Sequence, residues 1–251
     1  ALRSAPEISV DVNTGLKPDE LLKIIGDYHG LVIRSETKVT PEVFAAARNL
    51  KAIGRAGVGV DNIDRSAATD HGVVVMNTPS GNTISTAEHA FALMLSLARN
   101  IGQAHCSMIA GKWDRKSLSG VEMFGKRLAI LGMGRIGTEF AKRAQAFGMT
   151  VVAYDPFLTA ARAQSLKVEL AETAEIALTG ADVVTLHIPL TPETKHILDA
   201  RRIALMNKGA LIVNCARGGL VDEAAAKASI DSGHLAGIAL DVYEVEPPPA
   251  D

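Results

Sequence analysis

Residues 127–155 constrain the fold of this chain more than any other segment. An apolar run ends in a Gly-x-Gly-x-x-Gly turn formed by Gly132, Gly134 and Gly137, a helical stretch follows, and a second apolar run ends at Asp155. A strand, a glycine-rich turn, a helix, a second strand and an acidic residue in this order predict a parallel α/β unit that binds a dinucleotide. The glycines alone would also be compatible with an ordinary strand–helix turn.

Each glycine of the turn has its own physical role. Gly132 permits the tight turn, the missing Cβ of Gly134 lets a pyrophosphate approach the backbone, and Gly137 lets the helix lie close to its strand. The start of the helix then offers N–H groups and a partial positive charge to the phosphates. Asp155 lies 18 positions beyond Gly137, where a carboxylate can accept hydrogen bonds from both ribose hydroxyls. Because that carboxylate would repel a 2′-phosphate, the segment predicts NAD as the cofactor rather than NADP.

The composition fits a globular protein and argues against several classes of partner. The chain has 251 residues, of which 47% are hydrophobic and 22% charged, enough for one large or two modest domains. A net charge of −2 without a basic block argues against nucleic acid and anionic membranes. No apolar run approaches the roughly 20 residues that span a bilayer. Cys106 and Cys215 show neither a disulfide framework nor metal-ligand spacing, so we expect a reducing, cytoplasmic environment and no metal.

Two α/β patterns follow each other along the chain. In the first, helical stretches separate short β-branched runs, which lie at 8–12, 31–35, 52–56 and 73–76. A helical segment at 84–110, broken by Gly102, leads into the dinucleotide unit. Further strands are expected at 183–188, 210–215 and 237–242. Alternation of strands and helices predicts the α/β class with parallel, doubly wound sheets. We therefore expect one α/β domain at 1–79 and a Rossmann domain at 80–251.

Several motifs resemble those of the D-isomer-specific 2-hydroxyacid dehydrogenases, and the resemblance covers nearly the whole chain. The matching segments are 54–64, 77–82, 132–137, 214–223 and 239–248. The resemblance implies a flavodoxin-like substrate domain, an NAD-binding domain, and hydride transfer between NAD and a small 2-hydroxy acid. It is strongest to members that oxidise a phosphorylated 2-hydroxy acid, D-3-phosphoglycerate. Reduction of glyoxylate or hydroxypyruvate stays open, as does an NAD-sensing corepressor that binds partner peptides.

The resemblance also implies two catalytic residues. Arg217 would anchor the substrate and polarise the developing carbonyl, because its guanidinium is a planar, permanently charged donor fork at the end of a predicted strand. A surface arginine that caps a strand end is the alternative. Glu246 resembles the glutamate that holds a catalytic histidine and favours its charged form. An acidic loop residue before prolines is the alternative here.

Further site residues follow from the same resemblance. Beyond the glycines and Asp155, those expected to contact the cofactor are Arg135, Ile136, His187, Cys215, Ala216 and Asp241. Arg34 and Arg55 end adjacent predicted strands and would bind the carboxylate and phosphate of the substrate, with Ser35 and Gly57 beside them. Salt-bridged surface arginines are the alternative interpretation. His89 lies in the alanine-rich helical segment, where we expect it to pack.

The family's catalytic histidine belongs to a Pro-His motif downstream of the glutamate, and none of the seven histidines matches it. The printed sequence ends at Asp251, so we expect this polypeptide to bind NAD yet turn over poorly, and its first domain to lack an N-terminal strand and a return helix. The apolar character of the 84–110 segment and of the loop with Trp113 predicts a homodimer or tetramer.

Overall fold

The computed structural model describes residues 2–249 and divides into two compact units, residues 1–82 and 83–251. The boundary lies after Asn82 rather than after residue 79, because the turn before it is bound to unit 1. In that turn the Thr78 N–H donates to the Gly57 carbonyl at 3.0 Å, and helix α4 (Thr83–Ala98) begins only afterwards. Parallel sheets in both units confirm the predicted α/β class.

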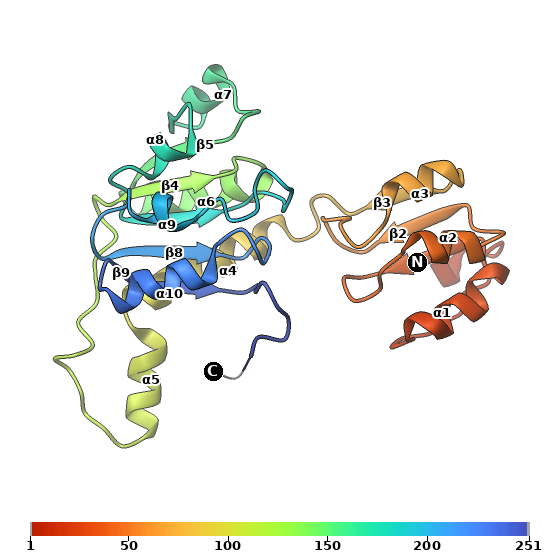
Figure 1. Ribbon diagram of the computed structural model, residues 1–251, viewed down its shortest axis with the longest axis horizontal. Coiled ribbons are helices and arrows are strands. Elements are labelled where there is room, and N and C mark those ends of the chain that lie inside the picture. Colours follow the sequence, from red (N-terminus) through yellow and green to blue (C-terminus); the bar gives the residue numbers. More distant parts are fainter. Residues whose placement is uncertain (1, 250–251) are drawn as a thin grey trace. The chain divides into compact units, whose positions relative to one another are not determined.

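Unit 1 is a parallel three-stranded sheet with helices against one face (Figure 1). Its strands are β1 (Gly30–Ile33), β2 (Ala52–Arg55) and β3 (Val74–Asn77), in the order β1-β2-β3. Its helices are α1 (Pro18–Ile24), α2 (Pro41–Ala46) and α3 (Arg65–Asp70), with short 3-10 helices at Leu2–Ser4 and Ile25–Asp27. Ile33 and Ile53 pack with Phe44 on the helical face. On the opposite face Val32 is 62% and Met76 52% exposed.

The strand expected at residues 8–12 is wrong, because the structure has irregular chain there. A β-strand is stable only when neighbouring strands satisfy its backbone groups, and within the described residues no strand pairs with this segment. A side-chain contact holds it instead, since the Tyr28 hydroxyl donates to Asp11 Oδ2 at 2.9 Å. The alternating β-branched residues at 8–12 predicted a strand from local pattern alone, but a strand also needs a partner, and this segment has none among the described residues.

Unit 2 contains a six-stranded parallel sheet in the order β6-β5-β4-β7-β8-β9. The strands are β4 (Arg127–Leu131), β5 (Thr150–Tyr154), β6 (Glu169–Leu170), β7 (Val183–Leu186), β8 (Ala210–Asn214) and β9 (Leu235–Leu240). The chain moves outward from β4 to β6 and then returns to the other side of β4. This reversal is the doubly wound Rossmann order, and it creates a switch point between β4 and β7, where open α/β sheets bind ligands.

Helices cover both faces of this sheet (Figure 1). The helices of unit 2 besides α4 are α5 (Ile101–Ile109), α6 (Arg135–Ala146), α7 (Ala160–Ser165), α8 (Ala174–Leu178), α9 (Ala200–Ile203) and α10 (Glu223–Asp231). Met94 of α4 and Phe140 of α6 pack on one face, whereas Leu178 of α8 and Ile203 of α9 pack on the other. Among the helices of the described part, none has both the length and the apolar character needed to cross a membrane.

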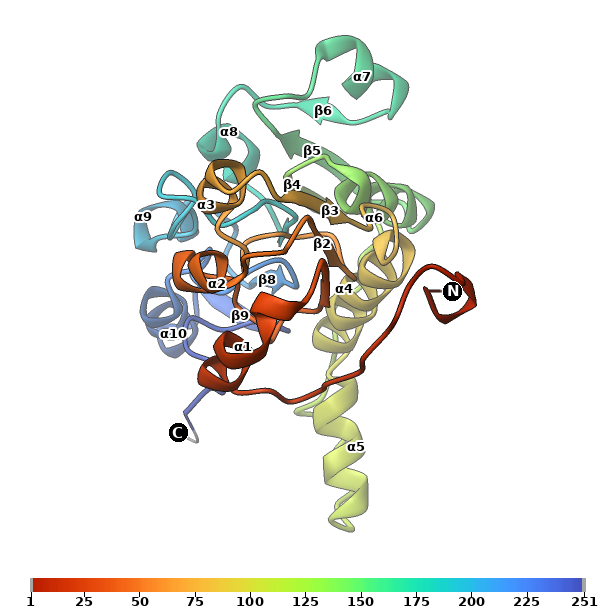
Figure 2. The ribbon, with the colours of Figure 1, turned by 90° about the vertical axis from the view of Figure 1, so that its right-hand side faces the viewer.

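The long helical segment is interrupted two residues earlier than expected. Asn100 has φ 52°, the left-handed conformation, and separates α4 from α5, whereas Gly102 lies inside α5. Asparagine tolerates this conformation better than most residues with a Cβ. Helix α5 then extends away from the rest of unit 2 (Figure 1 and Figure 2), and none of its residues is buried.

Candidate functional site

The residues expected to contact a cofactor follow the carboxyl ends of five strands of unit 2. Gly132 follows β4, Asp155 follows β5 and His187 follows β7. Cys215 comes directly after β8, and Asp241 directly after β9. Because all these strands are parallel, their carboxyl ends meet at one edge of the sheet. Residues scattered over more than a hundred positions are thereby brought to the edge where such folds bind nucleotides.

The three glycines of the turn meet very different surroundings. A Cβ on Gly132, whose φ is +99°, would lie 2.6 Å from Ile188 Cγ2 and 2.7 Å from the His187 carbonyl oxygen. A Cβ on Gly137 would lie 2.0 Å from the Gly132 carbonyl oxygen. A Cβ on Gly134 would meet nothing within 4 Å. The outer glycines are therefore required by packing, whereas the middle one borders open space.

The N-terminus of α6 begins at this open position. Gly134 is its N-cap and has no side chain to cap the first turn, which starts with Arg135 and Ile136 and contains no acidic residue. The first N–H groups of a helix lack intrahelical partners, and the helix dipole places a partial positive charge there. An anion such as a pyrophosphate would find hydrogen-bond donors at this helix end.

Asp155 is fixed by two backbone hydrogen bonds. Its Oδ2 accepts from the Met133 N–H and its Oδ1 from the Phe157 N–H, both at 2.8 Å. The carboxylate thus ties the glycine turn to the end of β5, a role that the sequence analysis did not anticipate. Because each carboxylate oxygen has two acceptor sites, one site on each remains for a hydroxyl group.

His187 is a neutral histidine held against the protein. Its Nε2 lies 3.1 Å from Thr185 Oγ1, and its ring centroid lies 5.4 Å from that of Phe140. Desolvation lowers the pKa of His187 to about 4, because burial disfavours the charged imidazolium. At neutral pH the side chain therefore has no acidic proton of the kind that a protonated catalytic histidine supplies.

Asn214 organises the turn after β8 and is a residue that the sequence analysis did not single out. It is 1% exposed, its Nδ2 donates to the Arg217 carbonyl at 2.8 Å, and its Oδ1 accepts from the Ala216 N–H at 3.0 Å. Its own carbonyl accepts from the Asp241 N–H at 3.0 Å, which joins the ends of β8 and β9. An asparagine at the end of a strand, just before a turn, was the available signal.

The segment after Arg217 lies against the segment that contains Glu246. A Cβ on Gly218 would lie 1.8 Å from the Tyr243 carbonyl oxygen, so only glycine permits this approach of the two backbones. The Tyr243 N–H in turn donates to Glu246 Oε1 at 3.1 Å. Arg217 itself donates from Nη1 to the Ala216 carbonyl at 2.6 Å. The two residues expected to be catalytic are thus on backbone segments in contact.

Two further side chains lie near the ends of β8 and β9. Cys215 is buried, and desolvation together with the nearby Asp241 carboxylate raises the pKa of its thiol to about 12. The expectation that His89 packs within its helix is wrong, since its side chain is 50% exposed and its Nε2 lies 3.3 Å from Asp241 Oδ1. Residue 89 is on the side of α4 that faces the end of β9, a position that helical periodicity alone could not identify.

Unit 1 contains the four residues expected to bind the substrate, and all four line one cavity of about 410 Å³. The lining residues are Arg34, Ser35, Arg55, Ala56, Gly57, Thr78, Gly81 and Asn82. Arg34 follows the end of β1 and Arg55 is the last residue of β2. Adjacent parallel strands therefore present two guanidinium groups to a common space.

Local contacts shape this cavity. A Cβ on Gly57 would lie 2.0 Å from Arg55 Nη1, so the glycine makes room for the guanidinium. The Gly57 N–H donates to the Arg55 carbonyl at 2.8 Å, so it is already used within the chain. Arg55 Nε is buried and, among the residues the structure describes, has no hydrogen-bond partner. Asn62, not singled out from the sequence, donates from Nδ2 to the carbonyls of Arg34 (2.8 Å) and Thr37 (2.7 Å).

Comparisons with known proteins agree on one family. Residues 91–251 match the family described as D-isomer specific 2-hydroxyacid dehydrogenase, NAD binding domain. A D-3-phosphoglycerate dehydrogenase from Methanocaldococcus jannaschii is 52% identical over 239 residues, which are 95% of this chain and 46% of that protein. The Bacillus subtilis D-3-phosphoglycerate dehydrogenase is 54% identical over 221 residues, which are 88% of this chain and 42% of that protein.

A solved structure is similar over most of this chain. The crystal structure of the TT0316 protein from Thermus thermophilus is 39% identical, with a TM-score of 0.86, and the match covers 94% of this chain and 74% of that one. The chain spans somewhat less than half the length of the curated relatives named above.

Proposed function

This chain belongs to the D-isomer specific 2-hydroxyacid dehydrogenase family, and we propose that it is part of an enzyme that oxidises D-3-phosphoglycerate to 3-phosphohydroxypyruvate with NAD, a step of serine biosynthesis. The observation that carries the proposal is the open position at Gly134. It borders the uncapped N-terminus of α6, while the two flanking glycines are closely packed. A turn of this kind accommodates a pyrophosphate without moving the backbone.

In this proposal the cofactor binds along the carboxyl edge of the unit 2 sheet. The Arg135 and Ile136 end of α6 holds the pyrophosphate, and Asp155 accepts hydrogen bonds from the ribose hydroxyls with the acceptor sites that Met133 and Phe157 leave free. When bound, NAD supplies the hydride acceptor. Further along the same edge, four residues flank the nicotinamide end: His187, Cys215, Ala216 and Asp241.

The proposed substrate carries two or three negative charges, and the positive charges of Arg34 and Arg55 can balance them. Arg34 and Arg55 share one cavity in unit 1 with Ser35, so a phosphate there would meet two guanidinium forks, which suit its geometry. The buried Nε of Arg55 without a protein partner favours a ligand at this place. We assign to Arg217 the carboxylate and the carbonyl oxygen that develops during oxidation, and to Glu246 the positioning of the acid/base.

Substrate preference tests this assignment. We expect the whole enzyme of which this chain is proposed to be part to oxidise D-3-phosphoglycerate with a higher kcat/KM than it reduces glyoxylate or hydroxypyruvate. Arg34→Gln should raise the KM for phosphoglycerate while changing the kinetics with glyoxylate much less, because glyoxylate has no phosphate. A preference for glyoxylate, or equal effects of Arg34→Gln on both substrates, would contradict the phosphate assignment. Capture of a partner protein that depends on NADH, with no turnover, would point to a corepressor instead.

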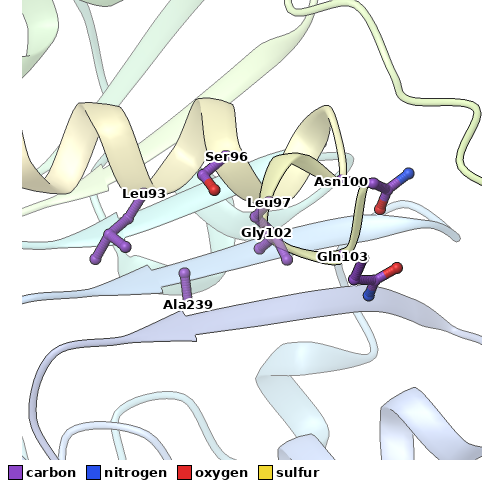
Figure 3. A pocket seen from close by; sticks show the side chains of 7 residues that line it. All are labelled: Leu93, Ser96, Leu97, Asn100, Gly102, Gln103 and Ala239. Carbon is purple, nitrogen blue, oxygen red and sulfur yellow. The ribbon is translucent and has the colours of Figure 1, made fainter. Parts of the chain in front are cut away.

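We also propose that unit 2 forms a homodimer through α5. The helix exposes Ile101 (54%), Met108 (55%) and Ile109 (74%), and Trp113 follows with 75% exposure. Exposed apolar groups gathered on one element usually mark an interface. The base of α5 also borders a cavity of about 180 Å³ lined by Leu93, Ser96, Leu97, Asn100, Gly102, Gln103 and Ala239. Figure 3 shows Leu93 and Leu97 of α4 directed toward Ala239 of β9 at this place.

Light scattering tests the dimer. We expect Ile109→Glu to shift the protein toward a monomer, because it places a charge among the exposed apolar side chains of α5, whereas Val12→Glu, at an exposed site in unit 1, should not. A monomeric parent protein at micromolar concentration would contradict the proposal. Both cysteines are free thiols, which fits the reducing cytoplasm that we propose for the protein.

A further inference from the structure

Unit 2 brings together three side chains of different chemistry. The imidazole of His89, the thiol of Cys215 and the carboxylate of Asp241 each offer one ligand atom, and these atoms all lie within 4.8 Å of one another. We propose that this cluster, the His89–Cys215–Asp241 site, binds Zn²⁺, and that bound zinc excludes the nicotinamide cofactor. The metal site stands on this geometry alone, whereas the competition with the cofactor rests on the function proposed above.

The spacing suits a tetrahedral metal. His89 Nε2 and Asp241 Oδ1 are 3.3 Å apart, and for Zn–N and Zn–O bonds of about 2.0–2.2 Å the edge of a tetrahedron is roughly 3.3–3.5 Å. The Cys215 sulfur, with a bond to zinc of about 2.3 Å, needs to lie roughly 3.5 Å from each of the other two ligand atoms. The side chains of His89 and Asp241 are 50% and 53% exposed, so both can rotate toward the sulfur without disturbing the core.

The donor set selects the kind of metal. Zinc accepts thiolate, imidazole and carboxylate ligands together, whereas Mg²⁺ and Ca²⁺ prefer oxygen ligands alone. On coordination the Cys215 thiol releases its proton to solvent and the sulfur bonds to the metal. Three protein ligands leave one position for water, the pattern of open zinc sites. A plain ion pair between His89 and Asp241 is the alternative, and it leaves the adjacent thiol without a role.

Rigid elements hold the three residues. His89 lies on α4, whose Ala90 and Met94 are fully buried in the core. Cys215 and Asp241 directly follow β8 and β9, and the hydrogen bond from the Asp241 N–H to the Asn214 carbonyl joins the two strand ends. Ligands placed by packed helices and strands keep their spacing better than ligands on loops, so the binding of zinc needs no backbone rearrangement.

Competition with the cofactor follows from the position of two ligands. Cys215 and Asp241 belong to the residues that we assign to the nicotinamide end of NAD, whereas His89 does not. A zinc ion bound to all three would occupy the same edge of the sheet. Free zinc would therefore inhibit the enzyme reversibly, and its removal by a chelator would restore activity.

Cobalt(II) tests the metal site directly, because it replaces zinc and absorbs light. The background is Cys106→Ser, which leaves Cys215 as the remaining cysteine. We expect a thiolate-to-cobalt charge-transfer band in the near ultraviolet that Zn²⁺ abolishes. Cys215→Ser should remove the band, and His89→Gln should weaken cobalt binding by at least roughly 10–100-fold, the loss seen when even an outer partner of a metal ligand is removed. The matched control His29→Gln, at an exposed histidine of unit 1, should leave it unchanged.

Absence of the band in the Cys106→Ser protein, or a band that persists after Cys215→Ser, would overturn the metal site. Competition is read from NADH titrations with and without Zn²⁺. We expect zinc to raise the apparent Kd for NADH in the parent protein but not in His89→Gln, which keeps the residues assigned to the cofactor. Cobalt binding with unchanged NADH affinity would overturn the competition. Failure of NADH to bind without any metal would instead refute the proposed function, while the cobalt spectrum would still decide the metal site.

Discussion

Alanine at the second and at the third glycine of the nucleotide turn should have opposite effects on stability. In Gly137→Ala the new Cβ would lie 2.0 Å from the Gly132 carbonyl oxygen and 3.1 Å from its carbonyl carbon, the first of these far below the 3.0 Å that real Cβ atoms respect. Helix α6 must therefore move away from β4. Overpacking of this kind costs about 1–3 kcal/mol, which lowers the Tm of a chain of 150–250 residues by about 2–12 °C.

Gly134→Ala should leave the fold intact. Its Cβ would meet nothing within 4 Å, and the φ of −65° at this position is ordinary for alanine. Loss of glycine's freedom in the unfolded chain would even stabilise the protein by about 0.4–1 kcal/mol. The added methyl group would nevertheless occupy the space that we assign to the pyrophosphate. We therefore expect NADH affinity to fall at least about tenfold, or about 1.4 kcal/mol.

Two measurements on the same samples separate these effects. Thermal unfolding without nucleotide reports the fold, and NADH fluorescence titration reports the site. The expected pattern is a lower Tm for Gly137→Ala and an unchanged or higher Tm with weak NADH binding for Gly134→Ala. If Gly134→Ala lost as much stability as Gly137→Ala, the packing argument would fail. If it bound NADH as tightly as the parent, the pyrophosphate would lie elsewhere.

Three further predictions follow from the site. Asp155→Asn should weaken NAD binding by about 1–3 kcal/mol, because charge-assisted hydrogen bonds are lost, and calorimetry that found equal NAD and NADP affinity in the parent would refute this role. In the full-length enzyme, Arg217→Lys should lower kcat/KM by about 10²–10³-fold, the usual loss when one group that stabilises developing charge is removed, while NADH affinity stays nearly unchanged. An active Lys variant would remove Arg217 from the mechanism. His187 has a folded pKa of about 4, below its unfolded value of about 6.5, so the unfolded chain binds the proton first. The free energy of unfolding should therefore fall by up to about 3 kcal/mol as pH drops from about 6.5 to about 4. Urea unfolding of His187→Gln should show a smaller change of this free energy with pH. Equal changes in the two proteins would contradict the role given to His187.

Local sequence was sufficient wherever a single segment decides the structure. The glycine turn after β4 and the acidic residue after β5 could be placed because positive φ, close backbone approach and an apolar run are properties of neighbouring residues. The start of α10 also depends on neighbouring residues, since Asp222 accepts from the Ala225 N–H at 2.9 Å. The strand expected at 8–12 failed for the complementary reason, because a strand depends on a neighbour that local pattern does not supply.

Tertiary structure decided everything that depends on which residues meet. The strand order places the ends of β8 and β9 side by side, so Asn214 and Asp241 form one hydrogen-bonded corner. His89 lies on the side of α4 that faces this corner, close to Asp241 and the Cys215 thiol, although 126 positions separate His89 from Cys215. Sequence specifies side-chain chemistry and short-range geometry. The spacing of distant groups follows only from sheet order and helix packing, because a parallel sheet collects its strand ends at one edge whatever their separation along the chain.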